Sequence, residues 1–227
     1  MQPRILGILE CAAANAAQTK LRATKGAQLR LKTYVRRNCL RAERKVEILE
    51  YKEEVAKLKE YQPQFPVIAE YLIEELQKAL PGIEAEHVGS TSVPDCPGKG
   101  VLDIMVLFQS TAERERIKET LRTLGFQNQT TRDPFPEDRP MRVGSFFFEE
   151  QSYPVHIHVI SAFSGEVEEL RSFREALKSS IQLRSEYAEL KKEIIEKGIT
   201  DTVDYAESKS AFIEKQLAAI RPSGNSA

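Results

Sequence analysis

Residues 87–106 read HVGSTSVPDCPGKGVLDIMV and join a Gly-Ser turn to a strand that carries a single carboxylate. Residues 83–88 predict a short strand, and the mostly apolar run at 101–108 predicts a second, buried one. Residues 89–100 are rich in Gly, Pro and Ser and predict a turn-rich connector. Asp103 is therefore expected inside a buried strand, where an unpaired charge is costly.

These residue types favour a phosphate and metal site. Gly89 lets the backbone approach a ligand closely. Ser90 and Thr91 can offer hydroxyl and backbone N–H groups to phosphate oxygens. The Asp103 carboxylate needs a partner, and a divalent metal carrying a nucleoside triphosphate, Mg²⁺ or Mn²⁺, would be one.

The rest of the chain predicts an α+β fold. Helical periodicity predicts helices at residues 42–59, 66–80 and 111–124, and helical structure through 166–220 with a break at Lys197-Gly198. Alternating apolar residues between turn signals predict further strands at 126–131, 142–148 and 155–161. The expected architecture is a small mixed sheet with flanking helices and a helical C-terminal cap.

Composition excludes several classes of protein. Of 227 residues, 41% are hydrophobic and 30% charged, as in ordinary soluble proteins. No apolar stretch is long enough to span a bilayer, which excludes an integral membrane protein. The three cysteines form no CxxC pair, so we expect a reducing, cytoplasmic location. P-loop, Gly-x-Ser-x-Gly, HExxH and dinucleotide-binding motifs are absent from the sequence.

Charge divides the chain into a basic arm and an acidic body. Residues 1–45 carry 11 Lys and Arg against two acids, a net charge of +9, so the remainder carries −10. We expect 1–45 to be a disordered extension, 46–221 to form the domain and 222–227 to be a disordered tail. The arm is also typical of transit peptides, which would make the location mitochondrial. Any binding of nucleic acid would have to use this arm.

The sequence resembles the GrpB family. The stretch HVGSTSVPDCPGKGVLDIMV is similar to that family's Gly-Ser-Thr-x-Val-Pro motif with its Lys and Asp-containing strand. His156-Ile157-His158-Val159 is similar to its His-x-His strand. FREALKSSIQLRSEYAELKKEI and YAESKSAFI are similar to its two closing helical motifs. The resemblance extends from Tyr61 to Leu217.

The resemblance implies the fold of the polymerase-β-like nucleotidyltransferase superfamily, in which two carboxylates alternate on one strand. Here the second position holds Met105, on the same face as Asp103 by strand alternation. A thioether is a poor ligand for Mg²⁺. His156 and His158 also share one face of a strand, where they could bind the metal with Asp103 or transfer protons. Alternatively, both histidines form hydrogen bonds with structural carboxylates.

Three cationic residues are further candidates for phosphate binding. Lys99 lies between glycines that give it access to a phosphate, or is a solvated loop lysine. Arg142 begins a predicted strand and could pair with an anionic substrate, or form a surface salt bridge. Lys209 belongs to YAESKSAFI, which the resemblance places over the site, although a single helical lysine is most simply solvated.

Two functions follow from these features. The first is an enzyme that binds a nucleotide or other phosphorylated small molecule and a divalent metal, and transfers a nucleotidyl or phosphoryl group to an acceptor. The catalytic and metal-binding residues would be Asp103, His156 and His158. The second is a degenerate nucleotide- or anion-binding module, marked by Met105 in place of the second carboxylate.

Overall fold

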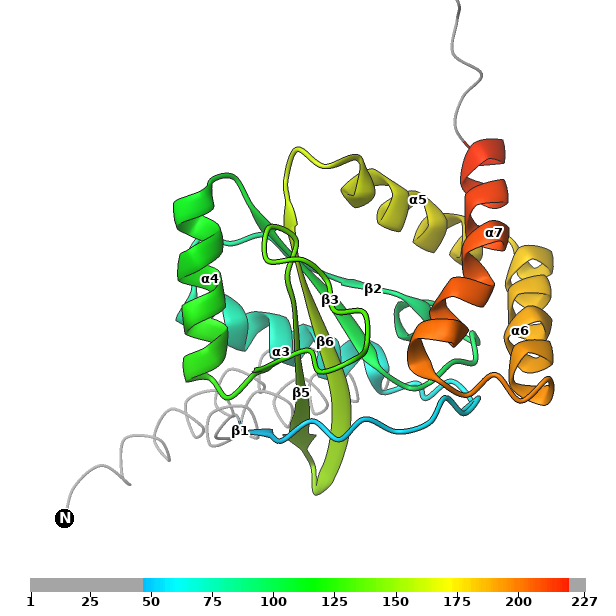
Figure 1. The fold of residues 1–227 in the computed structure, drawn as a ribbon, viewed down its shortest axis with the longest axis horizontal. Helices are drawn as coiled ribbons and strands as arrows, with labels where there is room; N and C mark the ends of the chain where they lie inside the picture. Colours follow the sequence, from blue (N-terminus) through cyan, green and yellow to red (C-terminus); the bar gives the residue numbers. More distant parts are fainter. Residues whose placement is uncertain (1–46, 221–227) are drawn as a thin grey trace, which may run out of the picture. The chain divides into compact units, whose positions relative to one another are not determined.

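A single mixed sheet organises the protein, whose computed structural model describes residues 47–220 (Figure 1). The strand order is β1-β5-β6-β3-β2, with β4 also pairing with β5. Strands β3 and β6 are parallel and every other pair is antiparallel. The strands are β1 Glu47–Leu49, β2 Ala85–Val88, β3 Leu102–Phe108, β4 Gln127–Asn128, β5 Met141–Phe148 and β6 Gln151–Ser161.

Helices surround the sheet, and the C-terminal ones form the predicted cap. Figure 1 shows α4 at one end of the sheet and the pair α6 and α7 at the other. Within residues 47–220, no helix is both long and apolar enough to cross a membrane. The helices are α3 Phe65–Ala79, η2 Ser90–Ser92, α4 Thr111–Thr123, α5 Gly165–Ser179, α6 Ile181–Glu196 and α7 Thr202–Ile220.

The main core lies on one face of the sheet. Strand alternation sends Leu102, Ile104 and Val106 to this face, where they are fully buried. Helix α3 covers them with an apolar stripe that includes Leu72, and α4 adds Ile117. This face carries no polar residue of the candidate site, because it is filled by the helices.

The opposite face is only partly covered. Helix α5 packs Val167 against a small apolar cluster that includes Val88 and Met105. Helices α6 and α7 pack around the connector, where the rings of Tyr187 and Phe212 are stacked with centroids 5.6 Å apart. The remainder of this face is open, and there the side chains of the candidate site are found.

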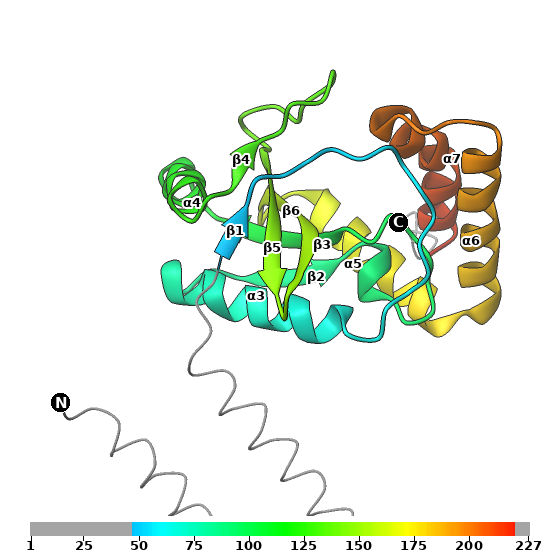
Figure 2. The same ribbon diagram turned by 90° about the horizontal axis from the view of Figure 1, so that it is seen from below.

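The predicted helix at 42–59 is wrong over its described part. Residues 47–49 pair with β5, and the following segment passes over the sheet to the C-terminal helices (Figure 2). Ala56 N–H donates to the carbonyl of Thr200, and Lys59 pairs with Gly98. Apolar residues at three- and four-residue spacing amid Glu and Lys favour a helix locally, but the pairing of residues 47–49 with the sheet edge outweighs that preference.

The other predicted elements are found, with shifts at their ends. The helices predicted at 66–80 and 111–124 are α3 and α4, and the region 166–220 is three helices with a break at Lys197-Gly198. The strand predicted at 126–131 is only two residues long. The mixed sheet, flanking helices and C-terminal cap confirm the α+β prediction. The predicted extension and tail lie outside the described residues.

Gly144 provides a test of this packing. An added Cβ would lie 2.7 Å from Cγ2 of Ile48 and 2.8 Å from Cδ1 of Phe126. We expect Gly144→Ala to lower the free energy of unfolding by about 1–3 kcal/mol in urea titrations, because overpacking is destabilising. The control is Gly165→Ala, where nothing lies within 4 Å of the added atom. Equal stability of the two variants would contradict this packing of β1 on β5.

Candidate functional site

A pocket of about 410 Å³ opens on the partly covered face of the sheet. Its floor carries Asp103 on β3 and the two histidines of β6, His156 and His158. The parallel register places Asp103 beside His156 and puts all three side chains on the same face. The connector contributes Gly89 and Ser90 at one wall. Strands distant in sequence therefore deliver one carboxylate and two imidazoles to a single cavity.

Gly89 is required by the approach of the connector to Asp103. Its φ of 69° and ψ of −174° lie in a region that only glycine populates readily. A Cβ at this position would lie 2.3 Å from Oδ2 of Asp103. Gly98 is in similarly close contact with Ser90, because a Cβ added at Gly98 would lie 2.3 Å from Oγ of Ser90. The absence of side chains at positions 89 and 98 thus leaves room for the side chains of Asp103 and Ser90.

Asp103 is held between two imidazoles. Its Oδ1 lies 3.4 Å from Nδ1 of His156 and 3.5 Å from Nε2 of His158, and its side chain is 24% exposed. Burial by itself raises the pKa of Asp103, but the hydrogen bonds from both histidines outweigh burial and hold that pKa well below its usual range. Asp103 is therefore ionised at neutral pH.

The outer nitrogen of His156 lies 3.1 Å from the hydroxyl of Tyr51. Tyr51 belongs to the segment after β1, which runs past the pocket. Burial, together with the charges of Glu53 and Asp103, raises the pKa of Tyr51 to about 12. The hydroxyl thus keeps its proton and can either donate to His156 or accept from it.

Two lysines line the pocket opposite the carboxylate. The ammonium of Lys209 lies 4.4 Å from the ring centre of Tyr205, and that of Lys99 lies 5.5 Å from the same ring. Burial and the charge of Lys99 lower the pKa of Lys209 to about 8. Burial also lowers the pKa of Lys99, although Asp103 opposes this. A bound anion would stabilise the charged forms of these two buried ammonium groups, although the pocket is also lined by the acidic residues Glu53, Asp133 and Glu207.

A third lysine, Lys191, is buried deeper and has protein partners. Its ammonium donates to the carbonyl of Pro97 and lies 3.3 Å from Sγ of Cys96. Burial lowers its pKa as well. Lys191 therefore ties α6 to the connector, and its hydrogen bonds are already used within the protein.

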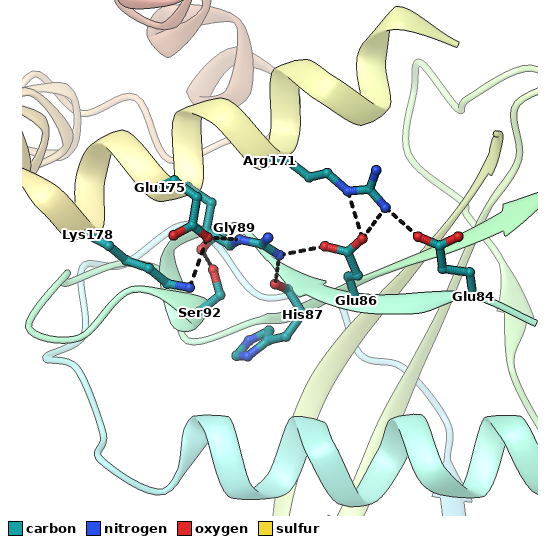
Figure 3. Close-up of polar contacts among 9 residues, drawn as sticks. Glu84, Glu86, His87, Gly89, Ser92, Arg171, Glu175 and Lys178 are labelled. Atoms are coloured by element: carbon teal, nitrogen blue, oxygen red, sulfur yellow. Dashed lines mark hydrogen bonds and ion pairs between the residues drawn. The ribbon is translucent and has the colours of Figure 1, made fainter. Parts of the chain in front are cut away.

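Ion pairs anchor the strand that leads into Gly89 (Figure 3). Arg171 and Arg174 of α5 both bind the carboxylate of Glu86, and Arg174 also donates to the carbonyl of His87 at 2.9 Å. The pKa of His87 falls to about 4, chiefly through burial. Its Nε2 lies 2.9 Å from Oγ1 of Thr91. This network fixes α5 over β2 and supports the turn from outside the pocket.

Most of the predicted residues meet in the pocket, and two do not. The pocket is lined by Gly89, Ser90, Lys99, Asp103, His156, His158 and Lys209. Thr91 is buried instead, and its hydroxyl donates to the carbonyl of Val101 at 2.9 Å. The neighbours of Arg142 in β5, Met141 and Val143, face the pocket, so strand alternation directs Arg142 to the helix-covered face. There its guanidinium lies 3.3 Å from the carboxylate of Glu137.

Met105 lies on the same face as Asp103, as predicted, but outside the pocket lining. It is fully buried in the cluster with Val88 and Ile160 beneath α5. A carboxylate here would be covered by apolar side chains and would face no ligand. The absence of a second acid is therefore part of how α5 packs.

No sequence pattern indicated Tyr51, Arg139 or Tyr205 as residues of the site. Tyr51 lies in the segment wrongly predicted as helical, and Arg139 belongs to a loop with no regular pattern. Tyr205 fits the apolar stripe of a helix, which predicts a core residue. It is indeed buried, with 2% exposure. Only tertiary structure brings Tyr51 and Tyr205 to the pocket wall and Arg139 into contact with His158.

Comparison with known proteins gives the family. Residues 55–219 match the family model described as GrpB protein. The chain belongs to the GrpB family. The UPF0157 protein BH1888 of Halalkalibacterium halodurans is 26% identical over 160 residues, covering 70% of this chain and 78% of that protein.

One solved structure of the same family supports the fold of this GrpB protein. The crystal structure of the conserved protein GrpB from Enterococcus faecalis has a TM-score of 0.57 and 20% identity, covering 72% of this chain and 96% of that one. The Cid1 poly(U) polymerase with MgGTP bound has a TM-score of 0.39 and 15% identity, over 58% of this chain and 42% of that one. The family and α+β fold implied by the sequence resemblance are thus confirmed.

Gly89→Ala tests the contact between the connector and Asp103. We expect a loss of roughly 2–5 kcal/mol in the free energy of unfolding, from backbone strain plus the clash with Oδ2. Gly82→Ala is the control, since Gly82 also has positive φ, at 86°, but open space around it.

A double-mutant cycle separates the two causes. In an Asp103→Ala background Oδ2 is absent, so Gly89→Ala is expected to cost clearly less than in the native protein, although the backbone strain and the 3.0 Å contact with Cβ of residue 103 remain. An unchanged cost in that background would show that the clash with Asp103 is not what requires glycine.

Proposed function

We propose that this GrpB protein binds a nucleotide or other phosphorylated small molecule, together with a divalent metal, and transfers a nucleotidyl or phosphoryl group to an acceptor. One observation carries the proposal: a single pocket holds an ionised carboxylate, Asp103, and two lysines whose pKa values are lowered by burial, Lys99 and Lys209. A metal complex of a polyphosphate has both charges that such a pocket lacks, a cation for the carboxylate and an anion for the lysines.

The phosphate half of the ligand would be bound by Ser90, Lys99 and Lys209. The two ammonium groups repel each other, and burial penalises both. A phosphate between them would remove this repulsion and accept charge-assisted hydrogen bonds. Ser90 lies beside Asp103 at the pocket wall, where its hydroxyl can donate to the same ligand.

The metal half would be bound at Asp103. Possible ligand atoms of Asp103, His156 and His158 all lie within 4.8 Å of one another. Of the two metals considered, one carboxylate with imidazole suits Mn²⁺ better than Mg²⁺, which prefers oxygen ligands. When bound, the metal would neutralise charge that develops on the transferred group. Asp103 would position it, and the lysines would orient the phosphates.

A second candidate, a binding module without turnover, is favoured by Met105. The residue that would be the second carboxylate is buried in the apolar cluster under α5. Asp103 is thus the only carboxylate among the three potential metal ligands. Two-metal catalysis would lack the second carboxylate that holds the metal ions. In this case the pocket would retain the phosphorylated ligand and leave it intact.

Thermal shift measurements with nucleoside triphosphates and Mn²⁺ or Mg²⁺ test the ligand. We expect the melting temperature to rise by roughly 5–10 °C at a ligand concentration near 100 times Kd, and more with Mn²⁺ than with Mg²⁺. Asp103→Asn, which keeps the volume and removes the charge, should abolish the metal-dependent part of the shift. Asp138→Asn, on the exposed loop before β5, should leave it unchanged.

The same samples distinguish the two candidates. Release of pyrophosphate or phosphate from the bound triphosphate, lost in Asp103→Asn, supports the enzyme. Binding without any conversion supports the module. No shift with any nucleotide or metal would contradict both.

The pKa of Lys209 predicts how phosphate binding depends on pH. Lys209 is charged below its pKa of about 8 and neutral above it. Metal-free nucleoside triphosphate, whose terminal phosphate is ionised above about pH 7, should therefore bind about tenfold more weakly at pH 9 than at pH 7.5. Lys209→Met should bind weakly at both values, whereas the exposed Lys197→Met should behave like the native protein. An affinity independent of pH in the native protein would contradict a role for Lys209.

A further inference from the structure

His158 lies between Asp103 and an arginine. Its Nε2 is 3.5 Å from Oδ1 of Asp103, and its Nδ1 is 3.1 Å from Nη1 of Arg139. A guanidinium is always protonated and has no acceptor, so Arg139 can only donate. Nδ1 of His158 must therefore accept. The proton of the neutral ring is then on Nε2, directed at Asp103.

Arg139 is held firmly in this position. Its Nε donates to Oε2 of Glu166 at 2.9 Å, and its Nη2 contacts Oε1 of the same carboxylate. Its guanidinium also lies 4.2 Å from the ring centre of Phe135. Glu166 itself is in the first turn of α5, where its N–H donates to the capping hydroxyl of Ser164. The start of α5 thus sets the direction of the Arg139 donor.

The other histidine of the strand has no such restriction. Nδ1 of His156 faces Asp103, and its Nε2 faces the hydroxyl of Tyr51. Because a hydroxyl donates and accepts, either nitrogen of His156 can carry the proton. In the metal-free protein Nδ1 of His156 donates to the carboxylate. When a metal takes the place of that proton, the ring can carry its proton on Nε2 and donate it to Tyr51, which leaves the Nδ1 lone pair for the metal. His156 can therefore act as a ligand, and His158 cannot.

We propose that Arg139, positioned by Glu166, keeps the proton of His158 on Nε2 and so excludes His158 from the ligand set of a divalent metal at Asp103. This inference rests on the proposed function for the metal itself. His158 becomes a hydrogen-bond donor that orients Asp103, and Arg139 is a positioning residue.

The consequence is a metal site that is incomplete in the protein alone. Asp103, His156 and His158 are the only group in residues 47–220 that could supply three such ligands, and one of them is excluded. Two protein ligands leave the remaining positions to phosphate oxygens and water. The metal is then expected to enter with the phosphorylated ligand, and to bind weakly without it.

The tautomer can be measured directly in metal-free protein. The chain has only three histidines, so the variants His87→Gln, His156→Gln and His158→Gln assign every imidazole in a long-range ¹H–¹⁵N spectrum. We expect His158 to show a protonated Nε2 and a bare Nδ1. A proton on Nδ1 in the native protein would overturn the inference whether or not any metal binds.

Arg139 variants test the cause. Lysine, like arginine, only donates, so Arg139→Lys should preserve the tautomer. Glutamine can present its carbonyl, so Arg139→Gln should allow a proton on Nδ1 and shift the ¹⁵N signals of His158. Unchanged signals in Arg139→Gln would overturn the role of Arg139, and the native spectrum still reports the tautomer if this variant fails to fold.

Mn²⁺ affinity, measured from the resonance of the free ion in the presence of a nucleoside triphosphate, tests the ligand set. His156→Gln should weaken binding by at least about tenfold, because it removes a ligand. His158→Gln should weaken binding less, because the glutamine amide can still donate a hydrogen bond to Asp103. Arg139→Gln should tighten binding, since it releases His158. Equal losses in the two histidine variants would overturn the two-ligand set. Failure of the native protein to bind Mn²⁺ would overturn both the two-ligand set and the proposed function. The tautomer of His158 is decided separately, by the ¹H–¹⁵N spectrum of the metal-free protein.

Discussion

The ionised carboxylate of Asp103 has to be stabilised in a strand whose neighbours are apolar, and the site is arranged around that requirement. Two imidazoles of β6 lie within hydrogen-bonding reach of it, because the parallel pairing of β3 and β6 brings both onto its face. The connector then approaches so closely that only glycine fits at position 89. The electrostatics of one side chain thus constrain both the strand register and the turn beside it.

Two partly desolvated lysines line the pocket around this centre, together with the acidic residues Glu53, Asp133 and Glu207. Lys99 and Lys209 both have lowered pKa values, from burial in the first place, and neither has a carboxylate partner as close as those of the arginines on α5. A protein that only needed to neutralise Asp103 would pair it with a lysine directly. Keeping the imidazoles at the carboxylate and the lysines across the pocket leaves space for a ligand that carries both charges.

Much of this could be predicted from the sequence, because the site depends on two local patterns. A turn with Gly89 and an apolar strand around Asp103 are visible in one segment, and alternation pairs His156 with His158. Arg142 could not be placed, since its face depends on the register of β5. Tyr51 and Arg139 reach the pocket from irregular segments, whose course is set by tertiary contacts and not by periodicity.

We propose that one pocket holds the metal and the phosphates together, with Asp103 and a single histidine as protein ligands. Hyperfine spectroscopy of Mn²⁺ in the presence of the protein and a nucleoside triphosphate can detect this arrangement. We expect coupling of the same ion to ³¹P and to one imidazole nitrogen, with the nitrogen coupling lost in His156→Gln. Coupling to ³¹P alone would show that the ion remains on the free nucleotide and that the protein does not bind the metal.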